Sequence, residues 1–435
     1  MFNLILFLII LSFNLGLLEN LFGLLPEVSG YIIDISILIV SVLVLLNGKS
    51  KYLKTLWIIP LFIIISLISK FFNSSEFILF VVGIRRYLMP IFMLFIGLNI
   101  YISDNNFHRL TKTIIFLFSV QFFVAIYKLY TVGMQEHMYI GTLANFGGAI
   151  STILPLLGIN LFLVLYLDSK KKVFILLMIS MLFFGYVGLK RALVFLAPIN
   201  IFLSIVFYYW LMHDSKLYKI FNPKVIISVG LLAMVIIYLG VRIMPTLNPE
   251  NKVWGSFDLA YTIDYAAGYE DRKDYGKLDG SGRLNAYEGI FYFLTSNTNA
   301  FHKLIVGIGP GTTERNSFTK FDQFSMEALG LGYASGLVGG AKTVLQFGLL
   351  GLIVYTLFLF KLFSLLVKFA LNFNVFQKKW LIITILWLLI MTVDFLFYSH
   401  LILIVRGMYL PLYLLIGYYV RKSLDSNFKH ENIIY

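Results

Sequence analysis

The sequence contains no cysteine among its 435 residues, which excludes disulfides, iron–sulfur clusters, thiolate metal sites and cysteine nucleophiles. Charged residues are also scarce: they make up 13% of the chain, about half of the share in a typical soluble domain. The six histidines show no metal-ligand spacing, and neither a His-Glu-x-x-His motif nor a paired acidic motif is present. We therefore expect no metal site and no cofactor.

Long apolar runs fill most of the chain. Hydrophobic residues make up 59% of the sequence, and the mean hydropathy is +0.86. Because a membrane-spanning helix takes roughly 20 residues, we predict an all-α polytopic membrane protein with about twelve transmembrane helices. The predicted spans lie near 2–24, 30–46, 55–71, 77–101, 113–132, 147–167, 173–189, 192–211, 224–244, 338–366, 380–398 and 400–420. The first span lacks the basic n-region and the cleavage site of a signal peptide, so we expect it to be retained.

The distribution of basic residues predicts the orientation in the membrane. The formal net charge is +13, which in a soluble protein would suggest a nucleic-acid partner. Here the lysines and arginines concentrate in the connections after the even-numbered spans and in the tail, 421–435. By the positive-inside rule both termini are cytoplasmic. We thus expect spans one to nine in 1–244, a large external loop in 245–337, spans ten to twelve in 338–420, membrane lipids as partners and no nucleic acid.

The external loop has its own structural signals. Apolar residues recur at helical spacing at Leu284, Tyr287, Ile290, Phe291 and Leu294, which predicts an amphipathic helix that lies on the membrane or closes over a cavity. Arg283 would begin this helix, where backbone N–H groups also attract anions. The glycines of 307–311 resemble a phosphate-binding loop, but the strand and helix of a nucleotide fold do not flank them. We interpret this segment as a turn.

Several cations fall in the outer halves of the predicted spans, against the inside bias. They are Arg85, Arg86, Lys190, Arg191, Arg242, Lys342 and Arg406. An intramembrane cation is costly unless it faces protein, water or an anion, so it is a candidate functional residue. Each could instead snorkel to the headgroups or pair with a carboxylate, for which Glu76, Glu136 and Asp394 are the plausible partners. The cations outnumber these acids, which favours an outward-facing cavity for an anionic ligand such as a phosphate.

Three local motifs accompany this topology. Gly188-Leu189-Lys190-Arg191-Ala192 is a small-residue-then-Arg turn between two spans, and Ser281-Gly282-Arg283 is followed by Tyr287. The glycine cluster 307–311 is followed by Lys342-Thr343-Val344-Leu345-Gln346-Phe347-Gly348. Together they resemble the O-antigen polymerase and ligase superfamily, membrane glycosyltransferases with about twelve spans, a large periplasmic loop and arginines facing the periplasm. Ligases of this superfamily typically carry a His just before the span that follows the loop. Its absence before Lys342 favours a polymerase of the Wzy type.

The resemblance implies a GT-C-like fold in the bacterial inner membrane and an activity. The enzyme would transfer glycan from undecaprenyl pyrophosphate to another lipid-linked repeat unit, so its partners would be the lipid-linked donor and acceptor, and a polysaccharide chain-length regulator protein. Arg191 and Arg283 would be catalytic and grip the pyrophosphate, and Glu288 is the candidate general base. Arg85, Arg86, Lys190, Arg242, Lys342 and Arg406 would bind substrate. The alternatives are an O-antigen ligase acting on lipid A–core and a lipid-linked oligosaccharide flippase.

Overall fold

The computed structural model describes residues 1–26, 29–47, 57–73, 77–134, 141–143, 148–212, 223–270, 285–295, 301–312, 337–368, 370 and 373–431. Within these ranges the regular structure is helical, with no β-strand. The α-helices are α1 (Phe2–Phe13), α2 (Ser29–Leu46), α3 (Ile58–Asn73), α4 (Phe77–Asn99), α5 (Asp104–Val132), α6 (Ile150–Ser169), α7 (Lys172–Val187), α8 (Arg191–Met212), α9 (Pro223–Ile243), α10 (Leu259–Glu270), α11 (Asn285–Thr295), α12 (Phe301–Val306), α13 (Gly339–Lys368), α14 (Val375–Val393), α15 (Leu401–Ile404) and α16 (Arg406–Glu431).

Eight helices of the described chain are long and apolar enough to cross a membrane: α2, α4, α5, α6, α8, α9, α13 and α14. Three shorter apolar helices, α1, α3 and α7, accompany them. The chain is therefore an all-α protein with the helices of a polytopic membrane protein. The predicted twelfth span, 400–420, covers the short helix α15 and the first half of α16, which is largely buried in the core of the bundle. The number twelve stays a prediction.

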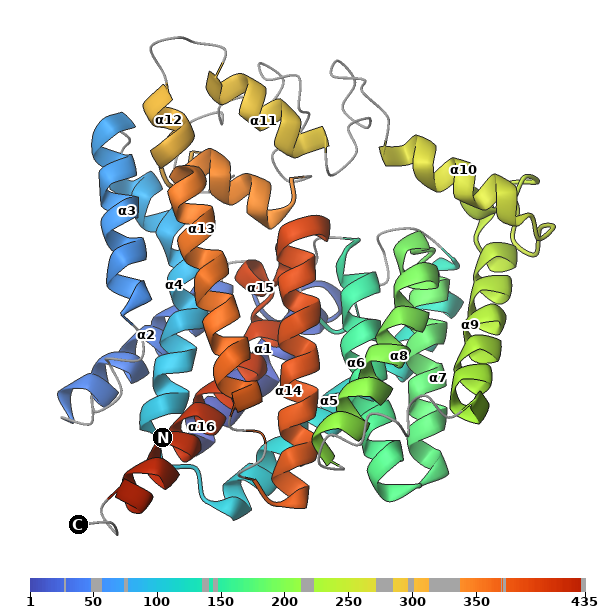
Figure 1. The fold of residues 1–435 in the computed structure, drawn as a ribbon, viewed down its shortest axis with the longest axis horizontal. Coiled ribbons are helices and arrows are strands. Elements are labelled where there is room, and N and C mark those ends of the chain that lie inside the picture. The colour runs from blue at the N-terminus through green and yellow to red at the C-terminus, as the bar shows by residue number, and fades with distance from the viewer. Residues whose placement is uncertain are drawn as a thin grey trace.

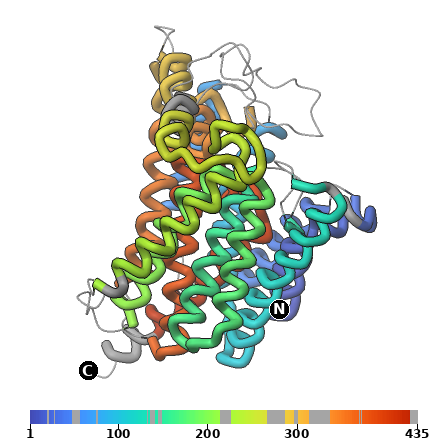
Figure 2. Tube along the Cα trace, turned by 90° about the vertical axis from the view of Figure 1, so that its right-hand side faces the viewer, coloured from blue at the N-terminus to red at the C-terminus, as the bar shows by residue number. Residues whose placement is uncertain are grey.

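The helices form an elongated bundle with a cap at one end. Figure 1 places α10, α11 and α12 at this end, which we name the loop end, whereas the C-terminus lies at the opposite end. In Figure 2, α10 lies across the end of α9. The helix predicted from the spacing of Leu284 to Leu294 is present as α11, but its apolar face does not lie open to a membrane. Ile290 and Leu294 are fully buried against the start of α13.

Three predicted spans are interrupted where the apolar runs gave no sign of it. The twelfth, 400–420, is broken at Val405, whose extended backbone (φ −93°, ψ 95°) separates α15 from α16. The first, 2–24, ends as an α-helix at Phe13, where the Ile10 carbonyl accepts from both the backbone N–H of Asn14 at 3.2 Å and its side-chain amide at 2.8 Å. A single π-helical turn, Leu17–Leu21, follows. The span 338–366 breaks at Gly348, which has φ +69° and ψ −173°. Such a backbone is open to glycine and strained for other residues, so α13 is two helices joined at an angle.

The glycine cluster of 307–311 compensates for this break. A broken helix leaves backbone carbonyls without intrahelical donors. The N–H of Ile308 donates to the Leu345 carbonyl at 2.8 Å, and that of Gly309 donates to the Gln346 carbonyl at 3.2 Å. From α3, the Ser69 hydroxyl also donates to the Gln346 carbonyl, at 2.9 Å. The segment is a turn, as predicted, and it ties α3 and α12 to the first half of α13.

Candidate functional site

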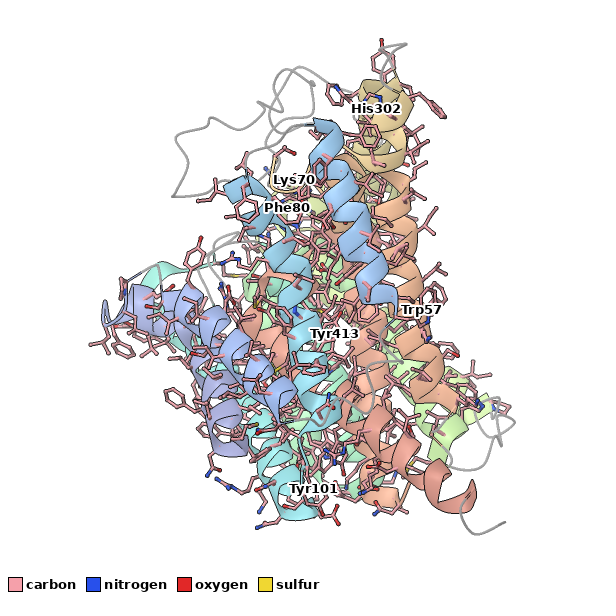
Figure 3. The ribbon with its side chains drawn as sticks, turned by 90° about the vertical axis from the view of Figure 1, so that its left-hand side faces the viewer. Trp57, Lys70, Phe80, Tyr101, His302 and Tyr413 are labelled. Carbon is pink, nitrogen blue, oxygen red and sulfur yellow. The ribbon has the colours of Figure 1, made fainter. Side chains whose placement is uncertain are left out.

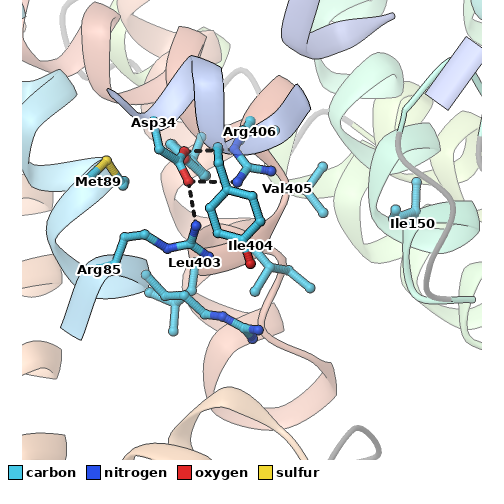
Figure 4. Close-up of a pocket in the computed structure, with 12 residues that line it drawn as sticks. Asp34, Arg85, Met89, Ile150, Leu403, Ile404, Val405 and Arg406 are labelled. Carbon is cyan, nitrogen blue, oxygen red and sulfur yellow. Dashed lines mark hydrogen bonds and ion pairs between the residues drawn. The ribbon is translucent and has the colours of Figure 1, made fainter. Parts of the chain in front are cut away.

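Three charged side chains from three helices meet near the middle of the bundle. Arg406, at the start of α16, donates from Nε and Nη2 to the two oxygens of Asp34 on α2, both at 2.7 Å. Arg85 on α4 donates from Nη1 to Asp34 Oδ2 at 3.0 Å. Figure 4 shows the three interactions converging on this carboxylate. Arg406 thus binds Asp34 with the two-pronged fork that arginine also uses for phosphate.

A close crossing of α4 and α16 brings the two arginines together. At Gly97 and Gly417 the backbones touch: a Cβ on Gly417 would lie 2.7 Å from the Gly97 Cα. Small residues allow this approach between membrane helices. Arg85 and Arg406 precede these glycines by 12 and 11 residues, or about 18 and 17 Å of helix. Because both helices run the same way, the two guanidinium groups arrive at nearly the same height.

The three charged residues line a cavity of about 300 Å³. Its lining also includes a third arginine, Arg86, and two tyrosines, Tyr31 and Tyr409. The Arg85 guanidinium lies 4.5 Å from the centre of the Tyr31 ring. We name this site the arginine pocket. With three arginines and a single carboxylate in its lining, it carries an excess of positive charge that suits an anionic ligand.

Burial makes the ion pairs of this pocket energetically important. The Asp34 side chain is 6% exposed, and those of Arg85 and Arg406 are each 19% exposed. Removing one partner of a buried ion pair typically costs about 3–5 kcal/mol, because the other charge is left uncompensated. Asp34 therefore holds both guanidinium groups in place. An incoming phosphate would find the donors already oriented, which is the condition for strong electrostatic stabilisation.

A second set of cations lies toward the loop end, around the start of α8. The chain turns sharply from α7 to α8 through Gly188, Leu189 and Lys190, and Leu189 adopts φ +52°. Arg191 begins α8, donates to the hydroxyl of Tyr265 on α10 and lies 5.4 Å from the centre of that ring. The sequence predicted this turn, and the structure adds Tyr265 as a contact of Arg191.

Arg242, at the end of α9, belongs to the same region. Its Nε donates to the Gly255 carbonyl at 3.1 Å, and its Nη1 donates to the Tyr238 hydroxyl at 3.0 Å. The guanidinium also lies 5.2 Å from the ring centre of Trp254. Within the described chain no carboxylate lies at ion-pair distance from Arg242. We name Arg191, Arg242 and their ring partners the aromatic-held arginines.

The remaining predicted site residues are dispersed. Lys190 and Lys342 are both buried, and neither lines the arginine pocket. Lys342 is followed by Thr343, and Arg86 is followed by Tyr87. The hydroxyl groups of Thr343 and Tyr87 share a hydrogen bond of 2.9 Å. Glu288 lies on the exposed side of α11 and does not line the pocket. Arg283 lies outside the described residues.

Tyr287, the aromatic residue that follows Arg283 in the sequence motif, fastens α11 to the helices beneath it. Its hydroxyl donates to the Leu396 carbonyl at 2.7 Å, and it packs so closely on α13 that a Cβ on Gly340 would lie 2.0 Å from its oxygen. Burial raises the pKa of Tyr287 to about 12. The group is therefore protonated at physiological pH and remains a donor that fastens α11 over the bundle.

The carboxylate that organises the arginine pocket was not predicted from the sequence. The predicted partners were Glu76, Glu136 and Asp394, whereas Asp34 pairs with both Arg85 and Arg406. Glu76 and Glu136 lie outside the described residues, and Asp394 accepts from the backbone N–H of Leu401 at 2.7 Å. The missed signal was depth in the membrane: Asp34 lies four residues into its predicted inward-running span, 30–46, and Arg406 lies six residues into 400–420. Tyr31 and Tyr409 gave no signal, because tyrosine is abundant throughout the chain.

Neither a model of a known protein family nor a curated protein sequence matches this chain. Among the described residues, no three His, Asp or Glu side chains gather in a way that could hold a metal ion. The function must therefore be inferred from the helices and the two sets of arginines.

Proposed function

We propose that this protein is a membrane glycosyltransferase that polymerises undecaprenyl-pyrophosphate-linked repeat units on the periplasmic side of the bacterial inner membrane. The observation that carries the proposal is the arginine pocket: three guanidinium groups converge on one cavity among apolar helices. A lipid-linked pyrophosphate needs both an apolar surrounding for its tail and several oriented cations for its charge. The local motifs that resemble the O-antigen polymerases support the same assignment.

The reaction needs leaving-group stabilisation above all. The bond between the sugar C1 and the pyrophosphate oxygen breaks, and undecaprenyl pyrophosphate leaves with the electron pair. The acceptor hydroxyl oxygen forms the new bond to C1 and gives its proton to a base or to solvent. Negative charge grows on the leaving oxygen, so guanidinium groups held in place before the reaction lower its barrier. We assign this task to Arg86 and Arg406, with Arg85 as support.

Asp34 would then act as a positioning residue. It presents the two-pronged face of Arg406 to the cavity and keeps Arg85 beside it. When a pyrophosphate enters, its oxygens compete with the carboxylate for the same N–H donors. The site can thus exchange one anion for another without leaving a buried cation unpaired at any stage.

The aromatic-held arginines suit the second substrate. Donor and acceptor both carry a pyrophosphate, and the acceptor reacts at the sugar end farthest from its own pyrophosphate. The two phosphate groups therefore need separate binding places. We assign the acceptor's pyrophosphate to Arg191 and Arg242 near the loop end, whereas Arg283, predicted from the sequence to be catalytic, lies outside the described residues. Glu288 remains a candidate general base on α11.

The test is a reaction of the purified protein with defined undecaprenyl-pyrophosphate-linked repeat units, without metal ions or nucleotide, resolved on a gel. A ladder of products that disappears in Arg86→Ala and Arg406→Ala supports the polymerase. Arg109→Ala is the matched control, since Arg109 contacts Asn3 and lines no part of the pocket. Transfer only after lipid A–core is added would instead identify a ligase. Transport of the lipid-linked glycan across vesicles without any transfer would identify a flippase.

A further inference from the structure

An apolar groove opens between α3 and α13 on the outside of the bundle. Nearer the loop end the two helices pack tightly, with the rings of Phe62 and Phe347 5.0 Å apart. Toward the other end they separate and leave a cavity of about 400 Å³. The residues that line it are Trp57, Ile58, Leu61, Val354, Leu357, Phe360, Lys361 and Ser364. Six of these eight are apolar.

The two polar lining residues are Lys361 and Ser364, and Lys361 places a positive charge at one end of the groove. Lys361 lies on α13, 13 residues beyond the break at Gly348, which is about 20 Å along the helix. Its Nζ is 5.3 Å from the ring centre of Trp57. Within the described chain no carboxylate lies at ion-pair distance from it. Trp57 is 55% exposed, and tryptophan and lysine together are typical of the membrane–water interface.

We infer that this groove binds one phospholipid with an anionic headgroup. An acyl chain would fill the apolar part between Leu61 and Leu357, and the phosphate would lie against the ammonium of Lys361. The shape fits a chain because the lining is apolar along its length, and the charge fits a phosphate because Lys361 stands at one end. The inference does not rest on the proposed enzymatic activity.

The place of Lys361 also determines which leaflet supplies the lipid. Trp57 lies at the end of α3 that is farther from α12, as the positions of Trp57 and His302 in Figure 3 show. Lys361 lies near the end of the predicted span 338–366 that leads into a basic connection, and the positive-inside rule assigns this end to the cytoplasmic side, where anionic lipids attract lysine. The bound lipid therefore sits in the opposite leaflet from the loop end, and the groove shares no lining residue with the arginine pocket.

The first experiment measures lipid preference. The purified full-length protein is titrated with phosphatidylglycerol and, separately, with phosphatidylethanolamine, and bound lipids are counted by native mass spectrometry. One phosphatidylglycerol should bind about fivefold more tightly than phosphatidylethanolamine, which corresponds to one lysine–headgroup contact. The preference should vanish in Lys361→Gln and persist in Lys368→Gln, which removes a charge from the same helix outside the groove. An unchanged preference in Lys361→Gln would overturn the inference.

The second experiment fills the groove. Leu61→Trp on α3 and Leu357→Trp on α13 each place an indole where the chain would lie, so both should lose the tightly bound lipid whatever its headgroup. Ile64→Trp and Ile353→Trp are the matched controls, because these exposed residues lie on the same helices but do not line the groove. Retention of lipid in both filled variants would refute the site. Displacement of phosphatidylglycerol by an equal concentration of undecaprenyl phosphate would show that the groove serves a polyprenyl lipid instead.

Discussion

The arginine pocket and the aromatic-held arginines accommodate the same kind of side chain in different ways. In the pocket, Arg85 and Arg406 share the carboxylate of Asp34 among buried helices. Near the loop end, Arg191 and Arg242 contact tyrosine hydroxyls, ring faces and a backbone carbonyl. An ion pair neutralises a guanidinium, whereas a ring face or a carbonyl holds it without cancelling its charge.

The two kinds of contact suit two tasks: orienting an arginine for reaction, and attracting an anion. A carboxylate fixes its arginines tightly, and its removal is costly, so the pocket is suited to a step in which small displacements reduce the rate. Arg242 contacts aromatic rings and a backbone carbonyl and, within the described chain, no carboxylate at ion-pair distance, so it keeps its attraction for an anion and is suited to binding. The comparison therefore predicts effects on stability and turnover at the pocket and on affinity at the loop end.

The largest effect should follow from removing Asp34. In Asp34→Ala, Arg85 and Arg406 lose their counter-charge, and we expect the free energy of unfolding to fall by about 3–5 kcal/mol, measured by thermal unfolding of the purified protein. Asp168→Ala is the matched control. It breaks the single pair between Asp168 and Lys379, which joins them at 2.6 Å with both side chains 17% exposed, and should cost less. Equal losses in the two variants would contradict a special role for Asp34.

A triple variant sharpens this result. Replacing Asp34, Arg85 and Arg406 together by leucine removes all three charges, and such apolar replacements of a buried ionic group are often neutral or stabilising. We expect the triple variant to recover most of the stability lost in Asp34→Ala while remaining inactive. Recovery of stability without activity would show that the charges serve function more than folding.

The next effect should appear in turnover. In Arg86→Ala the pocket loses a cation, and we expect kcat for polymerisation to fall about 10²–10³-fold, while the unfolding temperature changes less than in Asp34→Ala. The measurement is the rate of ladder formation at saturating substrate, with Arg109→Ala as the control. A fall in affinity with unchanged kcat would move Arg86 from transition-state stabilisation to simple binding.

Some elements of the fold could be predicted from the sequence, and others could not. The apolar runs located the long helices, and the spacing of Tyr287, Ile290 and Leu294 located α11, because burial repeats with the period of a helix. The break at Gly348 could not be anticipated. The residues on either side are apolar and compatible with a helix, and only the positive φ and the donors from 308–309 reveal the interruption.

The candidate site was anticipated in its residue types but not in its grouping. Intramembrane depth identified Arg85, Arg86 and Arg406 as unusual, because a charge there is costly. Depth alone could not show that Arg406, 320 residues after Arg86, shares a cavity with it, since that depends on the glycine crossing of α4 and α16. Asp34 was overlooked because a lone acid near a span end looks like an interfacial residue.

A smaller effect should follow from Arg191→Ala. Loss of a charge-assisted contact to a phosphate should raise KM for the acceptor about tenfold and leave kcat nearly unchanged, in contrast to Arg86→Ala. The measurement is initial rate against acceptor concentration at saturating donor. Tyr265→Phe is the companion variant: it keeps the ring beneath Arg191 but removes the hydroxyl, so it should change KM less. A kcat loss as large as that of Arg86→Ala would place Arg191 at the leaving group.

The smallest effect should come from Arg242→Ala. Its side chain is held by a carbonyl, a tyrosine hydroxyl and the ring of Trp254, and an exposed cation–ring contact contributes only about 0.5–1 kcal/mol. We expect the KM for the acceptor to rise about two- to fivefold, and less still in Trp254→Ala, which keeps the cation and removes the ring. Kinetics of both variants, run beside Arg191→Ala, test the comparison directly. If Arg242→Ala lowered kcat as strongly as Arg86→Ala, the two sets of arginines would act on one phosphate group, and the assignment of separate donor and acceptor sites would fail.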